Sequence, residues 1–255
     1  MFQLSAVIIT YNEEKNIARC IESLHGLADE VIVVDSLSKD ATVAIAESLG
    51  AKVIAQSFLG YIEQKNFALK QASHNHVLSL DADEALSPDL HASILALKSA
   101  NNFSGAAAMN RLTNYCGYWV RHGGWYPDTK VRLVDRRRAR WTGINPHDRL
   151  EADADCKVQH LKGDLLHYSY DTLDSHIEQI KRFSSIGAQA LYDKGRRSNL
   201  FTILVNPIAR FIRNYILRLG FLDGFTGYII ARNSSHAVFL KYVKLYQLQR
   251  KKQSQ

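Results

Sequence analysis

The chain has 255 residues, of which 46% are hydrophobic and 22% charged, a composition typical of one large globular domain or one domain with an appendage. Its three cysteines are widely spaced and lack metal-ligand spacing, so we expect no disulfide framework and a reduced, cytosolic protein. The sequence shows no signal peptide and no apolar stretch of roughly 18 residues, so we expect no membrane-spanning helix.

The formal net charge of +7 is unevenly distributed. Residues 196–255 contain eleven Lys or Arg residues and one acid, Asp223, so residues 1–195 carry a net charge of −3. A basic segment indicates an anionic partner, which is either nucleic acid or an anionic membrane surface.

The first hundred residues alternate between short apolar runs and segments with helical periodicity. The predicted strands cover residues 6–9, 31–34, 52–54 and 77–80. The predicted helices lie between Asn12, as N-cap, and Gly26, and over residues 41–49, 61–72 and 88–100. Buried strands separated by helices are typical of an α/β fold with a mostly parallel, Rossmann-like sheet and helices on both faces.

Polar and acidic residues follow these strands, at the sheet edge where parallel sheets bind ligands. Asp81 and Asp83 end an apolar run, and strand alternation would point both the same way. Mg²⁺ or Mn²⁺ prefers such carboxylates and leaves positions open for phosphate, which favours a metal–diphosphate site. The alternative is a strand followed by a polar turn and a helix beginning at Ser87 and Pro88.

No glycine-rich dinucleotide fingerprint and no P-loop occur, which disfavours a dinucleotide oxidoreductase and a P-loop enzyme. The segment of residues 105–170 is rich in aromatic residues, glycine and arginine. Aromatic rings stack on sugars, and arginine binds phosphate or carboxylate. The alternative for Trp119 and Trp141 is a place in a second core layer.

Four motifs carry a family resemblance: Val7–Glu14, Val33–Ser36, Gln64–Asn66 and Leu80–Asp83. Together they resemble the inverting nucleotide-sugar glycosyltransferases of family 2, which have the GT-A fold. Four later motifs resemble the branch of lipopolysaccharide inner-core β-glucosyltransferases: Gly124–Asp128, Trp141–Gly143, His147-Asp148 and Gly220–Gly224. The chain departs from the family at Leu37 and Ala41, where glycines are usual, and at Asp148, where the branch has glutamate.

The resemblance implies a donor site for a UDP-sugar. Its expected residues are Thr10, Tyr11, Glu13, Asp35, Lys65 and Asp81. Tyr11 would stack on the uracil, with Thr10 and Glu13 lining the pocket. Asp35 would accept from the ring N–H, and Lys65 would lie near the base or the phosphates. Asp81 would contact the ribose. Asp83 would bind the divalent cation, Mg²⁺ or Mn²⁺, which offsets charge on the leaving diphosphate.

For the acceptor, the resemblance implies Asp148 as the base that takes the hydroxyl proton. The other expected acceptor-site residues are Trp125, Tyr126, Asp128 and His147, with Asp128 as the reserve base. Three further histidines lack metal-ligand spacing and are interpreted as structural: His160, His167 and His176.

We predict three regions: a donor-binding half at 1–104, an acceptor-binding and catalytic half at 105–180, and basic amphipathic C-terminal helices at 181–255. Basic residues interleave with apolar ones at Ile203–Leu222 and Phe239–Leu248, which suits an anionic bilayer surface. The alternative is helices that pack on the catalytic domain and leave their charges in water. We expect a peripheral enzyme on the inner face of the cell membrane.

The expected reaction moves a hexose, glucose by resemblance, from a UDP-sugar to a lipopolysaccharide core or similar lipid-linked glycan. One alternative is a sugar nucleotidyltransferase, but that class has a glycine-rich basic loop where this chain has the acidic Thr10–Glu14. A second is a nucleic-acid-binding protein that uses the basic tail. It accounts for the charge but not for Asp35, Asp81 and Asp83, so we expect no nucleic-acid partner.

Overall fold

The computed structural model describes residues 1–100, 103, 105–144 and 147–253. The chain forms two compact units. The sheet unit comprises residues 1–112 and 128–168, and the helical unit comprises residues 113–127 and 169–255. The division into donor, acceptor and tail regions at residues 104 and 180 stays a prediction.

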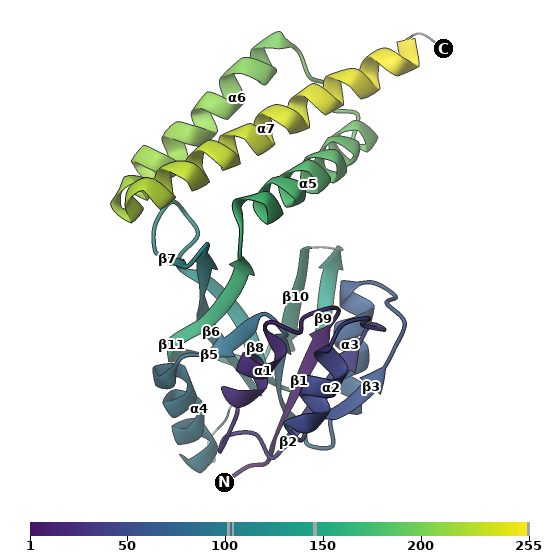
Figure 1. Ribbon diagram of the computed structural model, residues 1–255, viewed down its shortest axis with the longest axis vertical. Helices are drawn as coiled ribbons and strands as arrows, with labels where there is room; N and C mark the ends of the chain where they lie inside the picture. Colours follow the sequence, from purple (N-terminus) through teal and green to yellow (C-terminus); the bar gives the residue numbers. More distant parts are fainter. Residues whose placement is uncertain (101–102, 104, 145–146, 254–255) are drawn as a thin grey trace. The chain divides into compact units, whose positions relative to one another are not determined.

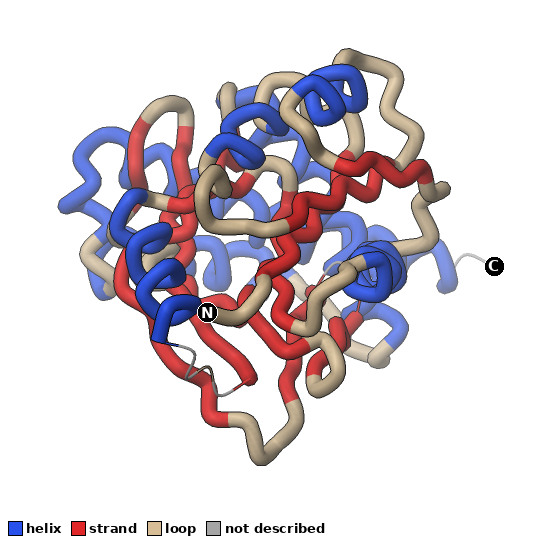
Figure 2. The backbone as a smooth tube through the Cα atoms, turned by 90° about the horizontal axis from the view of Figure 1, so that it is seen from below, coloured by secondary structure: helices blue, strands red, loops and turns tan. Residues whose placement is uncertain are grey.

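The sheet unit begins with the predicted alternation of strands and helices, which can be followed in Figures 1 and 2. Its parallel strands are β1 (Leu4–Thr10), β2 (Glu30–Asp35), β3 (Lys52–Ala55) and β4 (His76–Asp81), in the order β3-β2-β1-β4. Its helices are α1 (Ile17–Glu22), α2 (Thr42–Ser48), α3 (Tyr61–Gln71) and α4 (Pro88–Ala100). All four predicted strands are confirmed.

The predicted N-cap of the first helix is wrong. Helix α1 begins at Ile17, and its N-cap is Asn16. Asn12 has a positive φ of 54°, and its side-chain oxygen accepts from the backbone N–H of Lys39 at 2.8 Å. Asn12 therefore holds a loop instead of beginning the helix.

The remaining strands make the sheet mixed. They are β5 (Glu84–Leu86), β6 (Gly105–Tyr115), β7 (Tyr118–Val120), β8 (Asp128–Asp135) and β11 (Lys157–Tyr170), which complete a nine-stranded sheet. Strand β8 is antiparallel to β4 and β6, and β5 is antiparallel to β11. A separate antiparallel ribbon consists of β9 (Ala139–Ile144) and β10 (His147–Ala152). The predicted α/β class, with its C-terminal helical segment, is confirmed.

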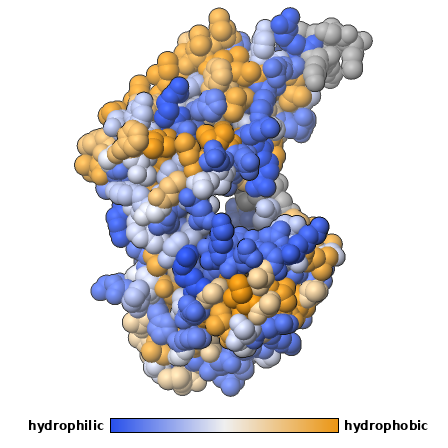
Figure 3. Space-filling model, in the orientation of Figure 1, coloured by the Kyte–Doolittle hydropathy of each residue, from blue (hydrophilic) through white to orange (hydrophobic). Residues whose placement is uncertain are grey.

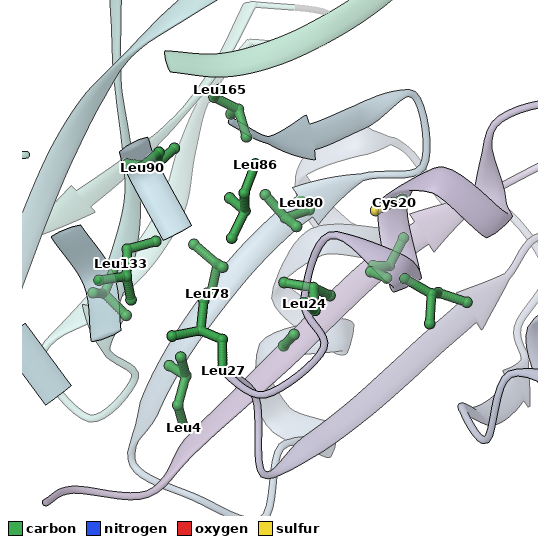
Figure 4. Close-up of a cluster of buried hydrophobic side chains, with 14 of the residues drawn as sticks. Leu4, Cys20, Leu24, Leu27, Leu78, Leu80, Leu86, Leu90, Leu133 and Leu165 are labelled. Atoms are coloured by element: carbon green, nitrogen blue, oxygen red, sulfur yellow. The ribbon is translucent and has the colours of Figure 1, made fainter. Parts of the chain in front are cut away.

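Alternate side chains of β1 enter two cores on opposite faces of the sheet. Leu4 and Ile8 join a cluster with residues of α1 and α4, part of which is shown in Figure 4. Val7 joins a second cluster with residues of α3 and with Trp141 of the β9–β10 ribbon. Covering both faces buries the central strands β1 and β4 and most of β2, and leaves the carboxyl ends of the strands as the place for a ligand.

The helical unit contains three long helices: α5 (Leu173–Asp193), α6 (Leu200–Ile212) and α7 (Gly224–Gln253). Two short turns join α6 to α7, namely the π-helical η1 (Arg213–Leu217) and the 3₁₀ η2 (Gly220–Asp223). Helix α7 packs against both α5 and α6. Among the described residues, no helix has the length and apolar character needed to span a membrane.

Candidate active site

Three predicted donor-site residues end neighbouring parallel strands. Thr10 ends β1, Asp35 ends β2 and Asp81 ends β4. The register pairs Thr10 with Asp35, and Ile9 with Asp81, so the strand pairing brings these residues together at one sheet edge. Within the described residues, the buried Thr10 hydroxyl has no hydrogen-bond partner, which makes it available to a ligand.

The loops that follow β1 and β2 are joined by hydrogen bonds. The backbone N–H of Asn12 donates to Ser38 Oγ at 2.8 Å, and that of Glu13 donates to Thr42 Oγ1 at 2.8 Å. Asp35 is buried and accepts from the Ser38 backbone N–H at 2.9 Å. Tyr11 is exposed on the same pair of loops. In this structure the Asp35 carboxylate accepts its hydrogen bond from Ser38. The hydrogen bond expected between Asp35 and uracil stays a prediction.

Leu37 lies in the second of these loops with a φ of 66°. Leucine stands here where the family resemblance leads one to expect glycine. Leu37 therefore adopts the left-handed backbone conformation that favours glycine. This conformation is strained for leucine because its Cβ clashes with the backbone.

Lys65 connects the predicted donor residue Asp81 to the predicted base Asp148. Its Nζ lies 3.0 Å from Asp81 Oδ1 and 2.7 Å from Asp148 Oδ2. Helix α3 is fixed beside the β9–β10 ribbon because the Asn66 side chain makes two 2.9 Å hydrogen bonds with the backbone of Trp141. The Trp141 ring centroid lies 4.4 Å from Lys65 Nζ, so the ammonium also faces an aromatic surface.

Arg132 of β8 is the second cation of this network. Its Nη2 lies 3.3 Å from Asp81 Oδ2 and 2.8 Å from Glu84 Oε1. The side chains of Arg132 and Glu84 are 4% and 0% exposed, so this ion pair is buried. Arg111 Nη1 adds a contact of 3.5 Å to Glu84 Oε1.

The network sets the protonation of its acids. Burial alone would raise the pKa of Asp81, but the charges of Lys65 and Arg132 outweigh it and hold the pKa well below its usual range. Burial also opposes ionisation of Glu84, yet Arg132 lowers the pKa of that carboxyl overall. Both carboxylates are therefore charged at neutral pH, and the side chain of Arg132 lies within ion-pair distance of both.

Asp83 does not share these partners. Strand β4 ends at Asp81, so the strand alternation expected to point both carboxylates the same way does not extend to Asp83, which lies in the turn before β5. Asp83 Oδ2 is 3.2 Å from His167 Nε2 on β11. Among the described residues, no group of three or more His, Cys, Asp or Glu side chains is placed to hold a metal ion. Asp83 and His167 offer two ligands, and phosphate and water would have to supply the others.

The predicted acceptor residues fall in both units. Asp128 and Asp148 lie in the sheet unit, whereas Trp125 and Tyr126 lie in the helical unit. Asp128 forms ion pairs with Arg111 and Lys130, whose charges outweigh burial and lower its pKa. The remaining residue of the set is His147, whose side chain lies outside the described part of the chain.

Trp125 belongs to a cluster of rings in the helical unit, with centroids 5.9 Å from Tyr115 and 5.8 Å from Tyr170. Trp141 is buried in the core of the sheet unit, which confirms the core alternative for this residue.

The family model for glycosyl transferase family 2 matches residues 5–154. The chain belongs to glycosyltransferase family 2. An uncharacterized glycosyltransferase of Rickettsia typhi is 34% identical over 258 residues, which cover 97% of this chain and 88% of the relative. The lipopolysaccharide core biosynthesis glycosyltransferase LpsC of Rhizobium meliloti is 29% identical over 250 residues, covering 96% and 92%.

Among solved structures, glucosyl-3-phosphoglycerate synthase from Mycobacterium tuberculosis, in complex with Mn²⁺, UDP and glucosyl-3-phosphoglycerate, is 26% identical over 44% of each chain, with a TM-score of 0.37. Family membership itself makes the protein a transferase with the GT-A fold, as the motifs predicted.

This family 2 glycosyltransferase has site residues that its motifs did not reveal. Arg132 was not among the predicted site residues, yet its side chain is buried among carboxylates. His167 was interpreted as structural because no ligand spacing marked it, but it lies against Asp83. Both belong to strands whose partners are distant in sequence, so only the fold brings them to the site.

Proposed function

We propose that this glycosyltransferase moves a hexose, with glucose as the first candidate, from a UDP-sugar to a lipid-linked glycan of the lipopolysaccharide core type, with inversion. The observation that supports this most is the position of Lys65, within 3.0 Å of Asp81 and 2.7 Å of Asp148. It shows that the predicted donor residue and the predicted base lie close together in one unit. The similarity to LpsC supports the choice of acceptor.

The donor is proposed to bind at the carboxyl ends of β1, β2 and β4. The exposed ring of Tyr11 would stack on uracil, and the buried hydroxyl of Thr10 and carboxylate of Asp35 would face the nucleoside. Asp83 and His167 fit a divalent cation, because a carboxylate and an imidazole are both ligands for Mn²⁺. When bound, the cation would offset negative charge on the leaving diphosphate.

Asp148 is proposed to act as the base. It would take the proton of the acceptor hydroxyl while that oxygen attacks the anomeric carbon and the bond from this carbon to the diphosphate breaks. Lys65 contacts Asp148 through Oδ2, and in the described part of the chain Oδ1 has no hydrogen-bond partner. Oδ1 is therefore the atom that would accept the proton.

The helical unit is proposed to rest on an anionic membrane surface, as a lipid-linked acceptor requires. Large apolar side chains are exposed along α6, the two short turns and the start of α7, and Figure 3 shows hydrophobic side chains gathered over this unit. They include Phe201, Ile208, Leu217 and Phe225. Arginines at positions 210, 213 and 218 interleave with them. An exposed apolar surface with basic residues suits binding in the plane of an anionic bilayer interface.

The transfer reaction is tested with labelled UDP-glucose and a lipid fraction that contains truncated lipopolysaccharide core. We expect transfer by the wild type, and a loss of about 100-fold or more for Asp148→Asn, because a general base contributes roughly 10²–10⁴-fold. Asp155→Asn, an exposed aspartate of the same unit, is the matched control and should leave the rate unchanged. An unchanged rate in Asp148→Asn would remove Asp148 from the role of base.

Membrane binding is tested by co-sedimentation with vesicles of phosphatidylcholine and phosphatidylglycerol. The double variant Phe201→Ser, Phe225→Ser should bind much more weakly, because both rings are at least 70% exposed. Phe58→Ser, which removes an exposed ring from the sheet unit, should bind like the wild type. Equal binding by all three proteins would contradict membrane docking through this surface.

A further inference from the structure

The turn at Gly220–Gly224 belongs to no part of the donor site, yet it contains the one acid of the C-terminal segment, Asp223. The Asp223 carboxylate is 3% exposed. It accepts from the backbone N–H groups of Arg121 and His122, at 3.2 and 2.8 Å, and from the Tyr118 hydroxyl at 3.5 Å. All these residues belong to the helical unit, so Asp223 fixes the loop that follows β7.

Asp223 also orients the ring of His122. His122 Nδ1 lies 2.9 Å from Asp223 Oδ1, so Nδ1 carries a hydrogen and donates it to the carboxylate. The side chain is 34% exposed, and in the described part of the chain Nε2 has no partner. A histidine whose Nδ1 is fixed by a buried carboxylate presents Nε2 to a ligand in a set orientation.

Arg218 lies against the same loop. A Cβ placed on Gly124 would be 2.1 Å from Arg218 Nη1, and the backbone N–H of Gly123 donates to the Arg218 carbonyl oxygen at 2.9 Å. Gly123 and Gly124 both have a positive φ, 68° and 84°, which lets the backbone approach this closely. Arg218 is an exposed residue, and among the described residues no acid forms an ion pair with its guanidinium.

The neighbours of Arg218 in the chain are apolar and face water. Leu217 is 72% exposed, and Leu219, Phe221 and Leu222 are exposed as well. A soluble anion would gain nothing from such neighbours. An amphiphile would gain from both features, because its anionic group would meet Arg218 and His122 while its chains covered the leucines.

We propose that Arg218 and His122, with Asp223 as a positioning residue, form a binding site for the anionic group, a phosphate or a carboxylate, of a membrane amphiphile. This inference goes beyond the proposed transfer reaction, and it rests on the proposed membrane binding of the helical unit. The arginine supplies charge-assisted hydrogen bonds, and the imidazolium form of His122 donates from Nε2–H to the anion while its Nδ1–H donates to the buried Asp223 carboxylate.

The test is the partition of the full-length protein onto three kinds of vesicle: phosphatidylcholine alone, with phosphatidylglycerol, and with truncated lipopolysaccharide. We expect Arg218→Gln to reduce binding to an anionic vesicle by more than about 20-fold, as for the loss of charge-assisted hydrogen bonds. The matched control, Arg232→Gln, removes an exposed arginine from α7 and should cost about fivefold or less, which is the diffuse effect of one basic residue.

A second variant, His122→Gln, removes the oriented ring N–H donor and should weaken binding about fivefold. If the variants lose binding to phosphatidylglycerol vesicles, the ligand is a phospholipid. If they lose binding only to lipopolysaccharide vesicles, the ligand is the acceptor lipid. Both outcomes support the site. Equal effects of Arg218→Gln and Arg232→Gln would overturn it. A thermal shift with UDP, measured on the same variants, separates this failure from failure of the donor site.

Discussion

Each unit of this glycosyltransferase contains a buried polar network, and the two networks differ in charge. In the sheet unit, the side chains of Lys65, Arg132, Asp81 and Glu84 neutralise one another. In the helical unit, the network around His176 is built from neutral groups: the Tyr115 hydroxyl lies 2.9 Å from His176 Nδ1, and the Asn233 amide donates to that nitrogen at 3.2 Å. The charged network suits a site for a charged nucleotide, and the neutral one suits a unit that exposes apolar surface.

The contrast extends to protonation. In the sheet unit, nearby positive charges outweigh burial and lower the pKa of both acids. At Tyr115 and His176 of the helical unit, burial dominates. It raises the pKa of Tyr115 to about 12 and lowers that of His176 to about 4. The stability of the sheet unit should therefore be sensitive to the loss of a single charge. The stability of the helical unit should be sensitive to the addition of one.

The largest effect is expected from Arg132→Met. The variant removes the closer of the two cations beside the buried Glu84 carboxylate, which keeps the 3.5 Å contact to Arg111 and a hydrogen bond from the Asp81 backbone N–H at 3.1 Å, and it removes one of the two cations beside Asp81. Breaking a buried ion pair costs about 3–5 kcal/mol. Urea unfolding should therefore show a loss of about that size. Arg137→Met is the control, because its side chain is 62% exposed, and it should cost less than about 1 kcal/mol. Equal losses in the two variants would contradict the account.

A smaller effect is expected from pH, through His176. Its pKa is about 4 in the folded state and about 6.5 in the unfolded chain, so between these values the unfolded chain binds more protons. Stability should therefore fall as the pH is lowered from 6.5 towards 4, by at most about 3 kcal/mol from this group. Unfolding free energies measured across that window should fall less steeply for His176→Gln. The exposed His160→Gln should keep the wild-type slope. If His176→Gln also kept it, His176 would not be the group responsible.

The smallest effect is expected at Leu37, which has a left-handed φ of 66°. Such a conformation costs a residue with a Cβ about 1–2 kcal/mol, and glycine loses about 0.5–1 kcal/mol through its unfolded-state freedom. Leu37→Gly should therefore stabilise the protein by up to about 1 kcal/mol in the same unfolding measurement. Leu59→Gly, at an exposed leucine whose φ is not positive, should destabilise it. Destabilisation by Leu37→Gly would show that the leucine makes a contact that outweighs its strain.

The sequence was sufficient for the parallel half of the sheet, because apolar periodicity and strand-end acids are local signals. It placed Thr10, Asp35 and Asp81 at one edge, and the register confirms this arrangement. The antiparallel half could not be predicted in the same way. Its strands pair with partners far away in the chain, and no local sequence signal identifies such a partner.

The same reason explains the two site residues that were missed. Arg132 is buried only because β8 lies beside β4, and His167 meets Asp83 only because β11 pairs with β5. The strand was also assumed to continue past Asp81, but β4 ends at that residue. The roles of the donor and acceptor residues are still predictions, and they need a ligand to test them.

The central claim, a UDP-sugar site at the carboxyl ends of β1, β2 and β4, is tested most directly by calorimetric titration of UDP into the protein. We predict binding by the wild type that is at least tenfold tighter with Mn²⁺ than without it. Asp83→Asn should lose this dependence on Mn²⁺, and Asp155→Asn should retain it. Absence of UDP binding under all conditions, or binding indifferent to both Mn²⁺ and Asp83→Asn, would contradict the account.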